Sequence, residues 1–467
     1  TIDDKTYDPP DSAAAANPAA PAQSMRHAVV LVPVSPRAAR NSFQTGASER
    51  RPAPLHAPQD RRAEAIGLVE AIDLEVAAAD FVPLPRRRPA TLFGTGKVEE
   101  IRTQISRLGA GLVIIDHVVS PVQQRNLEKA WGAKVLDRTG LILEIFGRRA
   151  ATREGTLQVE LAHLTYQKSR LVRSWTHLER QRGGAGFLGG PGESQLELDR
   201  RMLQDRIDAI KKDLEQVVRT RALHRAGRRK VPYPVAAIVG YTNAGKSTLF
   251  NRITGAGVMA KDQVFATLDP TMREVRLASG RRIILSDTVG FISDLPTMLV
   301  AAFRATLEEV IGADLILHVR DISHAESEAQ RLDVERVLVD LGIDPQAAGA
   351  PIVEVWNKLD LLAIEKQDEM RHAARRSERS AMPVSSVTGE GIEALLATID
   401  ARLGAADVEL TITVPAAGGR LLHWLHENAA VIERHVGDGG ETTCRIRIAA
   451  EKKPRLDAQL RRAGISG

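Results

Sequence analysis

Hydrophobic and polar positions change period several times along the chain, and each change predicts a different kind of structure. In residues 25–150, apolar runs typical of strands alternate with segments of helical spacing. In chain order these segments are 27–34, 62–71, 81–84, 97–108, 111–116, 121–131 and 134–137. Because strands that alternate with helices usually form a parallel sheet, we expect a small α/β domain over residues 25–150.

The next block, residues 151–231, has the period of a helical coiled coil. Apolar residues recur at steps of three and four in two runs, which begin at Leu157 and Leu203. A Gly/Pro-rich segment, residues 183–193, separates the runs, and we expect it to be non-helical. The pattern therefore predicts an antiparallel helical arm with a glycine-rich tip. Two ordinary core helices with a linker are the alternative, and Lys168 at a seam position favours it.

Two further domains are expected in the second half of the chain. From residue 232 to 404, apolar strands again alternate with helical segments, which predicts a doubly wound, mostly parallel sheet. Residues 405–467 are expected to form a small α/β domain. Its predicted elements are strands at 408–414 and 442–449, a helix over 419–434 and a final helix from residue 450. Residues 1–24 are rich in Ala and Pro and predict a disordered tail.

Composition excludes several classes of protein. The length of 467 residues fits about three domains, and 43% hydrophobic with 26% charged residues is typical of a soluble globular chain. The single cysteine, Cys444, excludes an intramolecular disulfide and a cysteine-based zinc site. We find no apolar run of the roughly 18 residues that a membrane helix needs, and no secretory signal at the start. We therefore expect a cytoplasmic protein without a membrane anchor.

Positive charge is concentrated on the predicted arm. The chain has 64 Lys and Arg against 59 Asp and Glu, a net charge of +5, yet residues 161–230 alone carry +8. A concentrated basic patch indicates a polyanionic partner, and a solvated helix face is the equally weighted alternative. If this partner is RNA, the arm would recognise its shape through phosphate contacts, and the affinity would depend strongly on salt concentration. The candidate contacts are Arg170, Arg173, Arg180, Arg182, Arg200 and Arg201.

One motif predicts a nucleotide site. An apolar strand at 235–239 leads into GYTNAGKS, residues 240–247, and a helix follows. Gly-x4-Gly-Lys-Ser between a strand and a helix is the pattern of a phosphate-binding loop, or P-loop, because main-chain N–H groups at the helix start attract phosphate. Lys246 would bridge the β- and γ-phosphates, and the Ser247 hydroxyl would ligate Mg²⁺. The nucleotide-binding residues expected here are Gly240, Asn243, Ala244, Gly245, Lys246, Ser247 and Thr248.

Residues at the ends of two later strands are expected to complete the phosphate site and to recognise the base of the nucleotide. The strand at 282–286 ends in DTVG, so Asp287 could hold Mg²⁺ through water and the Gly290 N–H could meet the γ-phosphate. The strand at 352–356 ends in NKLD, where the Asp360 carboxylate would accept hydrogen bonds from N1–H and N2–H₂ of guanine. Adenine has no such donors, so the site should prefer GTP to ATP. The other expected base-loop residues are Asn357, Lys358, Ser385 and Ser386.

Three residues near these motifs bear on hydrolysis. Thr267 in FATLDPT is expected to reach Mg²⁺ and the γ-phosphate, with a plain surface loop as the alternative. Phe291 follows Gly290 where a glutamine could orient the attacking water, so intrinsic hydrolysis should be slow. An amide oxygen at Asn243 could ligate K⁺, and we expect K⁺ to accelerate turnover. The expected catalytic residues are Lys246, Thr267 and Gly290.

These motifs resemble the Obg–HflX group of P-loop GTPases, and within it the HflX family. GYTNAGKS, FATLDPT, DTVGF and NKLD are shared widely in the group. The motifs more specific to HflX are GTGKVEEI (94–101), SPVQQRNLE (120–128), DRTGLILEIF (137–146) and GGPGESQLELDRR (189–201). Phe187 stands in a glycine-rich stretch where HflX proteins often have an arginine.

The resemblance implies a cytosolic GTPase that docks on the 50S ribosomal subunit, with its arm directed at 23S rRNA, and we expect it to act as a monomer. In its GTP-bound form such a protein splits stalled or idle 70S ribosomes, typically under stress, and the ribosome stimulates its slow GTP hydrolysis. Two alternatives stay open from the residues alone: a switch for a protein or membrane partner, and a nucleotide-driven RNA-remodelling enzyme. The GTGK segment, 94–97, favours a turn before a helix over an ATP site.

Overall fold

The computed structural model describes residues 26–34, 56–181, 191–228, 233–256, 265, 267, 270–294, 296, 304–347, 349–377, 380–404, 407–437, 439–449 and 452–465. The chain divides into two compact units. The first unit is Thr1–Ile145 with Gln167–Leu196, and the second is Phe146–Tyr166 with Glu197–Gly467. The predicted tail, 1–24, and residues 182–190 of the predicted arm tip lie outside the described residues.

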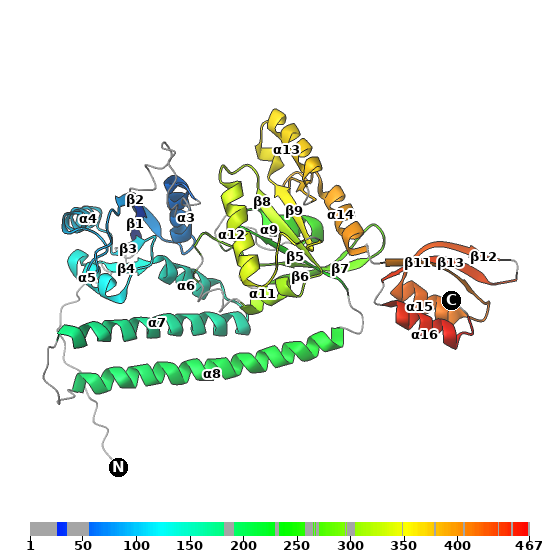
Figure 1. Ribbon diagram of the computed structural model, residues 1–467, viewed down its shortest axis with the longest axis horizontal. Helices are drawn as coiled ribbons and strands as arrows, with labels where there is room; N and C mark the ends of the chain where they lie inside the picture. Colours follow the sequence, from blue (N-terminus) through cyan, green and yellow to red (C-terminus); the bar gives the residue numbers. More distant parts are fainter. Residues whose placement is uncertain are drawn as a thin grey trace, which may run out of the picture. The chain divides into compact units, whose positions relative to one another are not determined.

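A parallel sheet with strand order β2-β1-β3-β4 forms the core of the first unit (Figure 1). The apolar residues of β1 before Val34 and those of β3 are buried, as a sheet covered by helices requires. Helix α5 begins at a capping box in which Ser120 and Gln123 satisfy each other's main-chain N–H groups. The elements are β1 His27–Val34, α3 Pro58–Glu70, β2 Glu75–Pro83, α4 Thr95–Leu108, β3 Leu112–Ile115, α5 Pro121–Trp131 and β4 Lys134–Asp137.

The prediction for one strand of this sheet began too late in the sequence and was too short. The expected strand over 81–84 is the end of β2, which begins at Glu75 and pairs with β1 along its whole length. The first half of β2 contains three consecutive alanines, which lack the β-branched side chains typical of strands. Pairing with the buried strand β1 overrides this weak local preference.

A buried ion network lies at the carboxyl edge of the sheet. Asp116, directly after β3, accepts hydrogen bonds from Arg61 at 2.8 Å and from Arg138 at 2.5 Å. Asp137, the last residue of β4, accepts one from Arg170 of helix α7 (Arg153–Gln181) at 2.6 Å. The Arg170 side chain is therefore engaged inside the protein. Its predicted role as an RNA-phosphate contact is wrong for this structure.

The predicted arm consists of α7 and α8 (Pro191–Arg228), with α6 (Arg138–Arg149) leading into it. In the second unit, Arg206 of α8 donates to Glu160 of α7 at 2.7 and 2.9 Å. Helix α8 begins at Pro191, so residues 191–193, which we expected to be non-helical, are helical. Proline lacks an N–H and suits the first turn of a helix, where that N–H would have no helical partner.

The predicted heptad seam is only partly buried. Ile207 and Ile210 of α8 are buried, as the spacing predicts. On α7, however, Leu157 and Leu161 are half-buried, and Val159 with the small Ala162 are more deeply covered. Heptad spacing thus located the helices but did not fix which residues of α7 are most buried. None of the described helices is long and apolar enough to cross a membrane.

The GTPase-type sheet of the second unit has strand order β10-β9-β8-β5-β7-β6, and β6 is antiparallel to β7. Because β5, β7, β8, β9 and β10 run parallel, their carboxyl ends lie along one edge, where such sheets bind ligands. The strands are β5 Val235–Gly240, β6 Thr271–Arg276, β7 Arg282–Asp287, β8 Leu315–Asp321, β9 Ile352–Asn357 and β10 Met382–Pro383. The helices are α9 Lys246–Thr254, α11 Arg304–Ile311, α12 Ser327–Asp340, α13 Ile364–Arg376 and α14 Ile392–Gly404.

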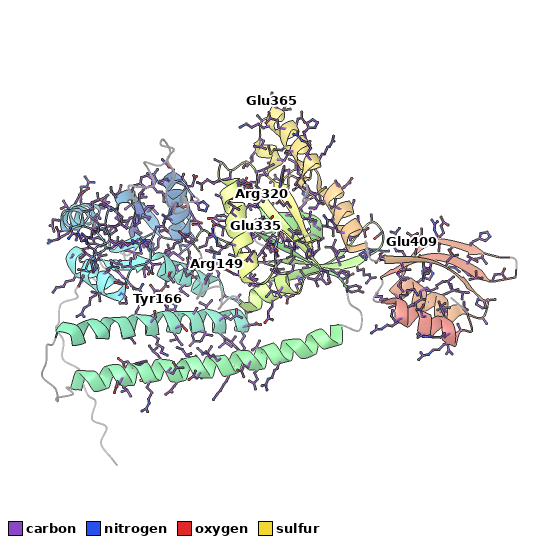
Figure 2. All side chains as sticks on the ribbon, in the orientation of Figure 1. Arg149, Tyr166, Arg320, Glu335, Glu365 and Glu409 are labelled. Carbon is purple, nitrogen blue, oxygen red and sulfur yellow. The ribbon has the colours of Figure 1, made fainter. Side chains whose placement is uncertain are left out.

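Charged side chains gather where α12 packs against β8. Arg320 of β8 pairs with Glu354 of β9 at 2.9 Å and with Glu328 of α12 at 2.8 Å. Glu335 of α12 is 7% exposed and pairs with Arg331 (Figure 2 labels Arg320 and Glu335). His318, also on β8, is buried beside these groups.

The C-terminal segment forms an antiparallel sheet with strand order β11-β13-β12 and helices α15 and α16 (Figure 1). We expected one helix over 419–434, but α15 is Gly419–Asn428, and Ala430–Val436 is strand β12. The β-branched Val431, Ile432 and Val436 favour this strand, which pairs with β13. The remaining elements are β11 Asp407–Val414, β13 Thr442–Ala449 and α16 Lys453–Arg462, which begins three residues later than expected.

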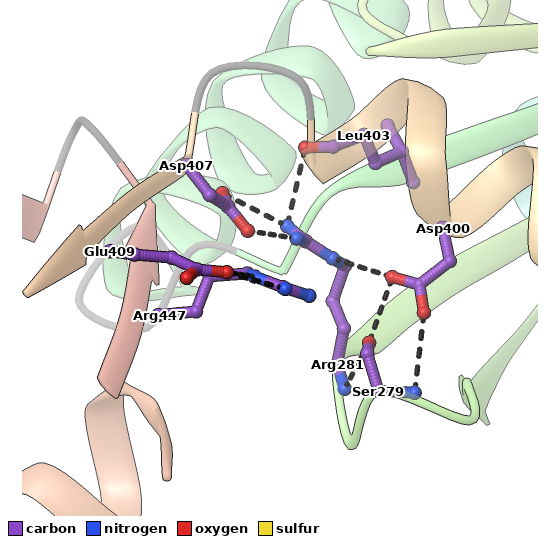
Figure 3. A network of polar contacts seen from close by, with 7 residues as sticks. All are labelled: Ser279, Arg281, Asp400, Leu403, Asp407, Glu409 and Arg447. Carbon is purple, nitrogen blue, oxygen red and sulfur yellow. Dashed lines mark hydrogen bonds and ion pairs between the residues drawn. The ribbon is translucent and has the colours of Figure 1, made fainter. Parts of the chain in front are cut away.

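One arginine joins this segment to the GTPase-type sheet (Figure 3). Arg281, in the turn between β6 and β7, donates to Asp400 of α14 at 3.2 Å and to the Leu403 main-chain oxygen at 3.2 Å. It also pairs with Asp407, the first residue of β11. Ser279 of the same turn donates to Asp400 at 2.8 Å. The turn, the end of α14 and the start of β11 are thus held together by one guanidinium group.

Candidate nucleotide site

The loop between β5 and α9 approaches its neighbours so closely that two positions accept only glycine. A Cβ on Gly240 would lie 2.2 Å from the main-chain oxygen of Val319. A Cβ on Gly245, whose φ is +89°, would lie 2.2 Å from Nδ2 of Asn357. Steric exclusion of a Cβ therefore explains why this fold requires glycine at the first and last glycine positions of the predicted P-loop.

Lys246, the first residue of α9, is buried and lies beside Gly290. Its Nζ donates to the main-chain oxygen of Tyr241 at 2.7 Å, and a Cβ on Gly290 would approach it to 2.9 Å. Burial lowers the pKa of Lys246 to about 8, although the carboxylate of Asp287 opposes this effect. The structure thus brings together the two residues that were predicted separately to meet the γ-phosphate.

Ser247, Thr267 and Asp287 converge on one point from three segments of the chain. Oδ2 of Asp287 accepts from Ser247 Oγ at 2.7 Å and from Thr267 Oγ1 at 3.0 Å, and the two hydroxyls lie 2.8 Å apart. Burial raises the pKa of Asp287, and the Ser247 hydroxyl is the largest effect that lowers it. Among the described residues, Oδ1 of Asp287 has no hydrogen-bond partner. Two hydroxyls and a buried carboxylate are hard oxygen donors that suit a magnesium ion.

Asn357, the last residue of β9, connects the predicted base loop to the P-loop. Its Nδ2 donates to the Ala244 main-chain oxygen at 2.8 Å, and its Oδ1 accepts from the Ser386 N–H at 3.0 Å and hydroxyl at 2.8 Å. Ser385 is buried, and its hydroxyl accepts from the Thr388 N–H at 3.0 Å. Loops that follow β9 and β10 are therefore tied to the phosphate loop by hydrogen bonds.

Asp360 is placed for an external partner. Its Oδ1 is buried and has no hydrogen-bond partner among the described residues, which is costly unless a ligand donates to it. Lys358, two residues earlier, has a left-handed backbone with φ +65° and pairs with Asp321 at 2.8 Å. The carboxylate of Asp360 thus has the unused acceptor that the guanine-recognition hypothesis requires.

Three other residues singled out in the sequence, Asn243, Thr248 and Phe291, occupy different environments. Asn243 is exposed and has a φ of +59°, and Thr248 is half-buried in the first turn of α9. Phe291 is buried, and its main-chain oxygen accepts from the Thr242 N–H at 2.7 Å. A buried ring at this position supplies no polar atom to an attacking water.

Sequence reasoning missed two residues that hold the site. Asp321, at the carboxyl end of β8, anchors Lys358, and Arg252 of α9 donates to the Ser386 main-chain oxygen at 3.2 Å. Asp321 could have been found from its position, because it ends a strand at the ligand-binding edge of the sheet. Arg252 carries no such signal.

The fold and this edge define a P-loop GTPase with additional N-terminal and C-terminal domains. Family models match almost the whole described chain: "GTP-binding GTPase N-terminal" over residues 59–147 and "GTP-binding GTPase Middle Region" over 149–228. The model "50S ribosome-binding GTPase" matches residues 235–358, and "HflX C-terminal domain" matches 369–465. The chain belongs to the HflX family of GTPases. It binds GTP and GDP and hydrolyses GTP.

Curated relatives are similar over most of their length. "GTPase HflX" of Magnetococcus marinus is 49% identical over 402 residues, which are 86% of this chain and 91% of the relative. "GTPase HflX" of Escherichia coli is 44% identical over 360 residues, 77% of this chain and 83% of the relative. A crystal structure of a GTP-binding protein from Sulfolobus solfataricus in complex with GDP is 23% identical, covers 81% of this chain and 98% of its own, and has a TM-score of 0.42.

Proposed function

We propose that this GTPase binds the 50S ribosomal subunit and, in its GTP-bound form, splits 70S ribosomes. The observation that carries the proposal is a basic helical arm in the same chain as a domain matched by the "50S ribosome-binding GTPase" model. Membership of the HflX family supports it. The protein would act as a cytoplasmic monomer, and GTP hydrolysis would release it from the ribosome.

The arm is suited to an RNA partner by length and charge. Helix α8 has 38 residues, which corresponds to about 57 Å at the rise of an α-helix. Arg200 and Arg201 near its start are exposed, and the block 161–230 has twice as many basic as acidic residues. With Arg170 engaged at Asp137, we propose Arg200 and Arg201 as the described arginines that meet 23S rRNA phosphates.

We propose that Ser247 and Thr267 hold Mg²⁺ directly and that Asp287 holds it through water. The ion would neutralise phosphate charge, while Lys246 and the Gly290 N–H would bind the β- and γ-phosphate oxygens. Asp360 would accept from the guanine ring, with Asn357, Lys358, Ser385 and Ser386 shaping its pocket. Because Phe291 is buried and apolar, intrinsic hydrolysis would be slow until the ribosome supplies a polar group.

Potassium is proposed as an accelerating ion at Asn243, whose exposed side chain lies in the P-loop. Turnover measured in KCl should exceed turnover in NaCl at the same ionic strength. Asn243→Ala should remove that difference. Equal rates in the two salts would refute the assignment.

Splitting is tested directly on sucrose gradients. Vacant 70S ribosomes incubated with the protein and a non-hydrolysable GTP analogue should convert to 30S and 50S peaks, and GDP should leave 70S intact. Deletion of residues 183–190 should abolish splitting while GTP affinity is unchanged, because the deletion does not touch the nucleotide site. Intact 70S in both nucleotide states would overturn the proposed function.

A further inference from the structure

Phe265 has a backbone conformation that phenylalanine rarely adopts. Its φ is +57°, in the left-handed region where a Cβ is strained, and its side chain is only 2% exposed. Strain of this kind persists where the surroundings enforce it, and it often marks a working part of a protein. The question is what holds Phe265 in this conformation.

The partner of Phe265 is Phe146. The two ring centroids lie 4.6 Å apart and the ring planes meet at 70°, the edge-to-face geometry that aromatic pairs favour. Phe146 is 1% exposed, so both rings are removed from water. This contact anchors Phe265 to the last turns of helix α6.

Anchoring Phe265 restricts Thr267, which follows it by two residues. Two residues of main chain reach about 7 Å at most, so a fixed Phe265 limits where the Thr267 hydroxyl can lie. That hydroxyl is 2.8 Å from Ser247 Oγ and 3.0 Å from Asp287 Oδ2. The ring pair therefore fixes the main chain two residues before Thr267, the residue that is proposed to bind Mg²⁺ and the γ-phosphate.

Phe146, the other member of the ring pair, lies close in sequence to the first helix of the arm. Helix α6 ends at Arg149 and α7 begins at Arg153, so Phe146 lies less than two helical turns before the arm. Phe146–Tyr166 belongs to the same compact unit as the GTPase domain. In this part of α7, Glu160 pairs with Arg206 of α8.

We propose that Phe265 is a positioning residue for Thr267, and that its ring pair with Phe146 transmits the state of the γ-phosphate position to the start of α7. The proposed contact between the nucleotide site and the start of α7 is this pair of aromatic rings. This proposal rests on the proposed function for one later step only, the action of the arm on the ribosome.

Nucleotide affinities test the positioning role. F265A removes the ring and keeps a Cβ on the strained backbone, whereas F265G removes the ring and relieves the strain. Both should weaken binding of a non-hydrolysable GTP analogue about three- to tenfold and leave GDP affinity unchanged, because GDP has no γ-phosphate for Thr267 to meet. F265G binding the GTP analogue like the wild type would refute the role of the ring.

Hydrogen exchange tests the transmission to the arm. In the wild type, amides of residues 153–166 should exchange at different rates with the GTP analogue and with GDP. F146L keeps an apolar side chain but removes the aromatic edge, and this difference should disappear. F93L is the matched control, because Phe93 is an equally buried ring that contacts Trp131 and should preserve the difference.

Two results would overturn the transmission: equal exchange in the two nucleotide states of the wild type, or a difference that persists in F146L. Neither measurement involves ribosomes, so they separate this proposal from the proposed function. If ribosome splitting fails while the exchange difference depends on Phe146, the proposed function is wrong and the coupling stands.

Discussion

The side-chain amide of Asn357 donates from Nδ2 to the main-chain oxygen of Ala244 at 2.8 Å, so the base loop and the P-loop share one hydrogen-bonding side chain. The other end of the amide accepts two hydrogen bonds from Ser386. Within this motif, Asn357 thus joins the two loops, while Oδ1 of Asp360 has no hydrogen-bond partner among the described residues, as the proposed contact with guanine requires.

Replacing Gly245 by alanine tests this close approach. The new Cβ would lie 2.2 Å from Asn357 Nδ2 and displace it from Ala244, so GTP affinity should fall by roughly ten- to a hundredfold. Gly255→Ala is the matched control, because its φ is also positive at +66° but nothing lies within 4 Å of the added atom. Equal losses in the two variants, measured by fluorescent-nucleotide titration, would mean that backbone strain and not the contact with Asn357 limits binding.

Base recognition is tested by Asp360→Asn. The carboxamide can donate to O2 of xanthine but cannot accept from both guanine donors, so preference should move from GTP to XTP. GTP affinity should fall by at least roughly a hundredfold, because a site built around hydrogen bonds strongly rejects a mismatched edge. Competition binding with GTP, XTP and ATP measures the change, and D360A, which can neither accept from guanine nor donate to xanthine, should bind neither GTP nor XTP tightly. A D360N protein that still prefers GTP would refute the assignment.

Arg281→Met should destabilise the joint in Figure 3. It would leave Asp400 and Asp407, whose side chains are 16% and 7% exposed, without their cation, at a cost of about 3 kcal/mol. Arg282→Met is the matched control: Arg282 and its partner Glu274 are about half exposed, and such surface pairs contribute roughly 0–1 kcal/mol. Urea denaturation measures both, and hydrogen exchange in β11 should rise in R281M alone. Equal stability of the two variants would show that the joint does not depend on Arg281.

Acidification should destabilise the GTPase domain through His318. Burial lowers the pKa of His318 to about 4, with Glu354 and Glu335 raising it and Arg320 and Arg331 lowering it. Below pH 6.5 the unfolded chain binds a proton that the folded chain refuses until about pH 4. The free energy of unfolding should therefore drop by about 3 kcal/mol over this interval from His318 alone. Urea unfolding at several pH values gives the free energy of unfolding as a function of pH. This free energy should fall less steeply with acidification in H318Q than in the wild type, and an equal fall in the two proteins would contradict this account.

Much of the nucleotide site could be predicted because its residues belong to short motifs at strand ends. Ser247, Asp287 and Asp360 each follow directly from a local pattern, and a parallel sheet brings strand ends to one edge. Thr267 was predicted to reach Mg²⁺ from the loop before β6, and its hydroxyl lies 2.8 Å from Ser247 Oγ and 3.0 Å from Asp287 Oδ2. The α/β class also follows from the alternation of strands and helices.

Features that depend on long-range pairing could not be predicted. Strand β12 was taken for the end of a helix, because its pairing with β13 is not visible in local spacing. Arg170 was grouped with exposed arginines, because charge counting cannot show that Asp137 lies opposite it. The ring pair of Phe146 and Phe265 joins residues more than a hundred positions apart, and nothing in the motifs that contain them, DRTGLILEIF and FATLDPT, indicates this contact.

Co-sedimentation with 50S subunits tests most directly whether γ-phosphate occupancy controls ribosome engagement. The protein bound to a non-hydrolysable GTP analogue should pellet with 50S at physiological salt and be released as salt rises, whereas the GDP-bound protein should stay in the supernatant. Equal pelleting in the two nucleotide states, or none in either, would contradict the account.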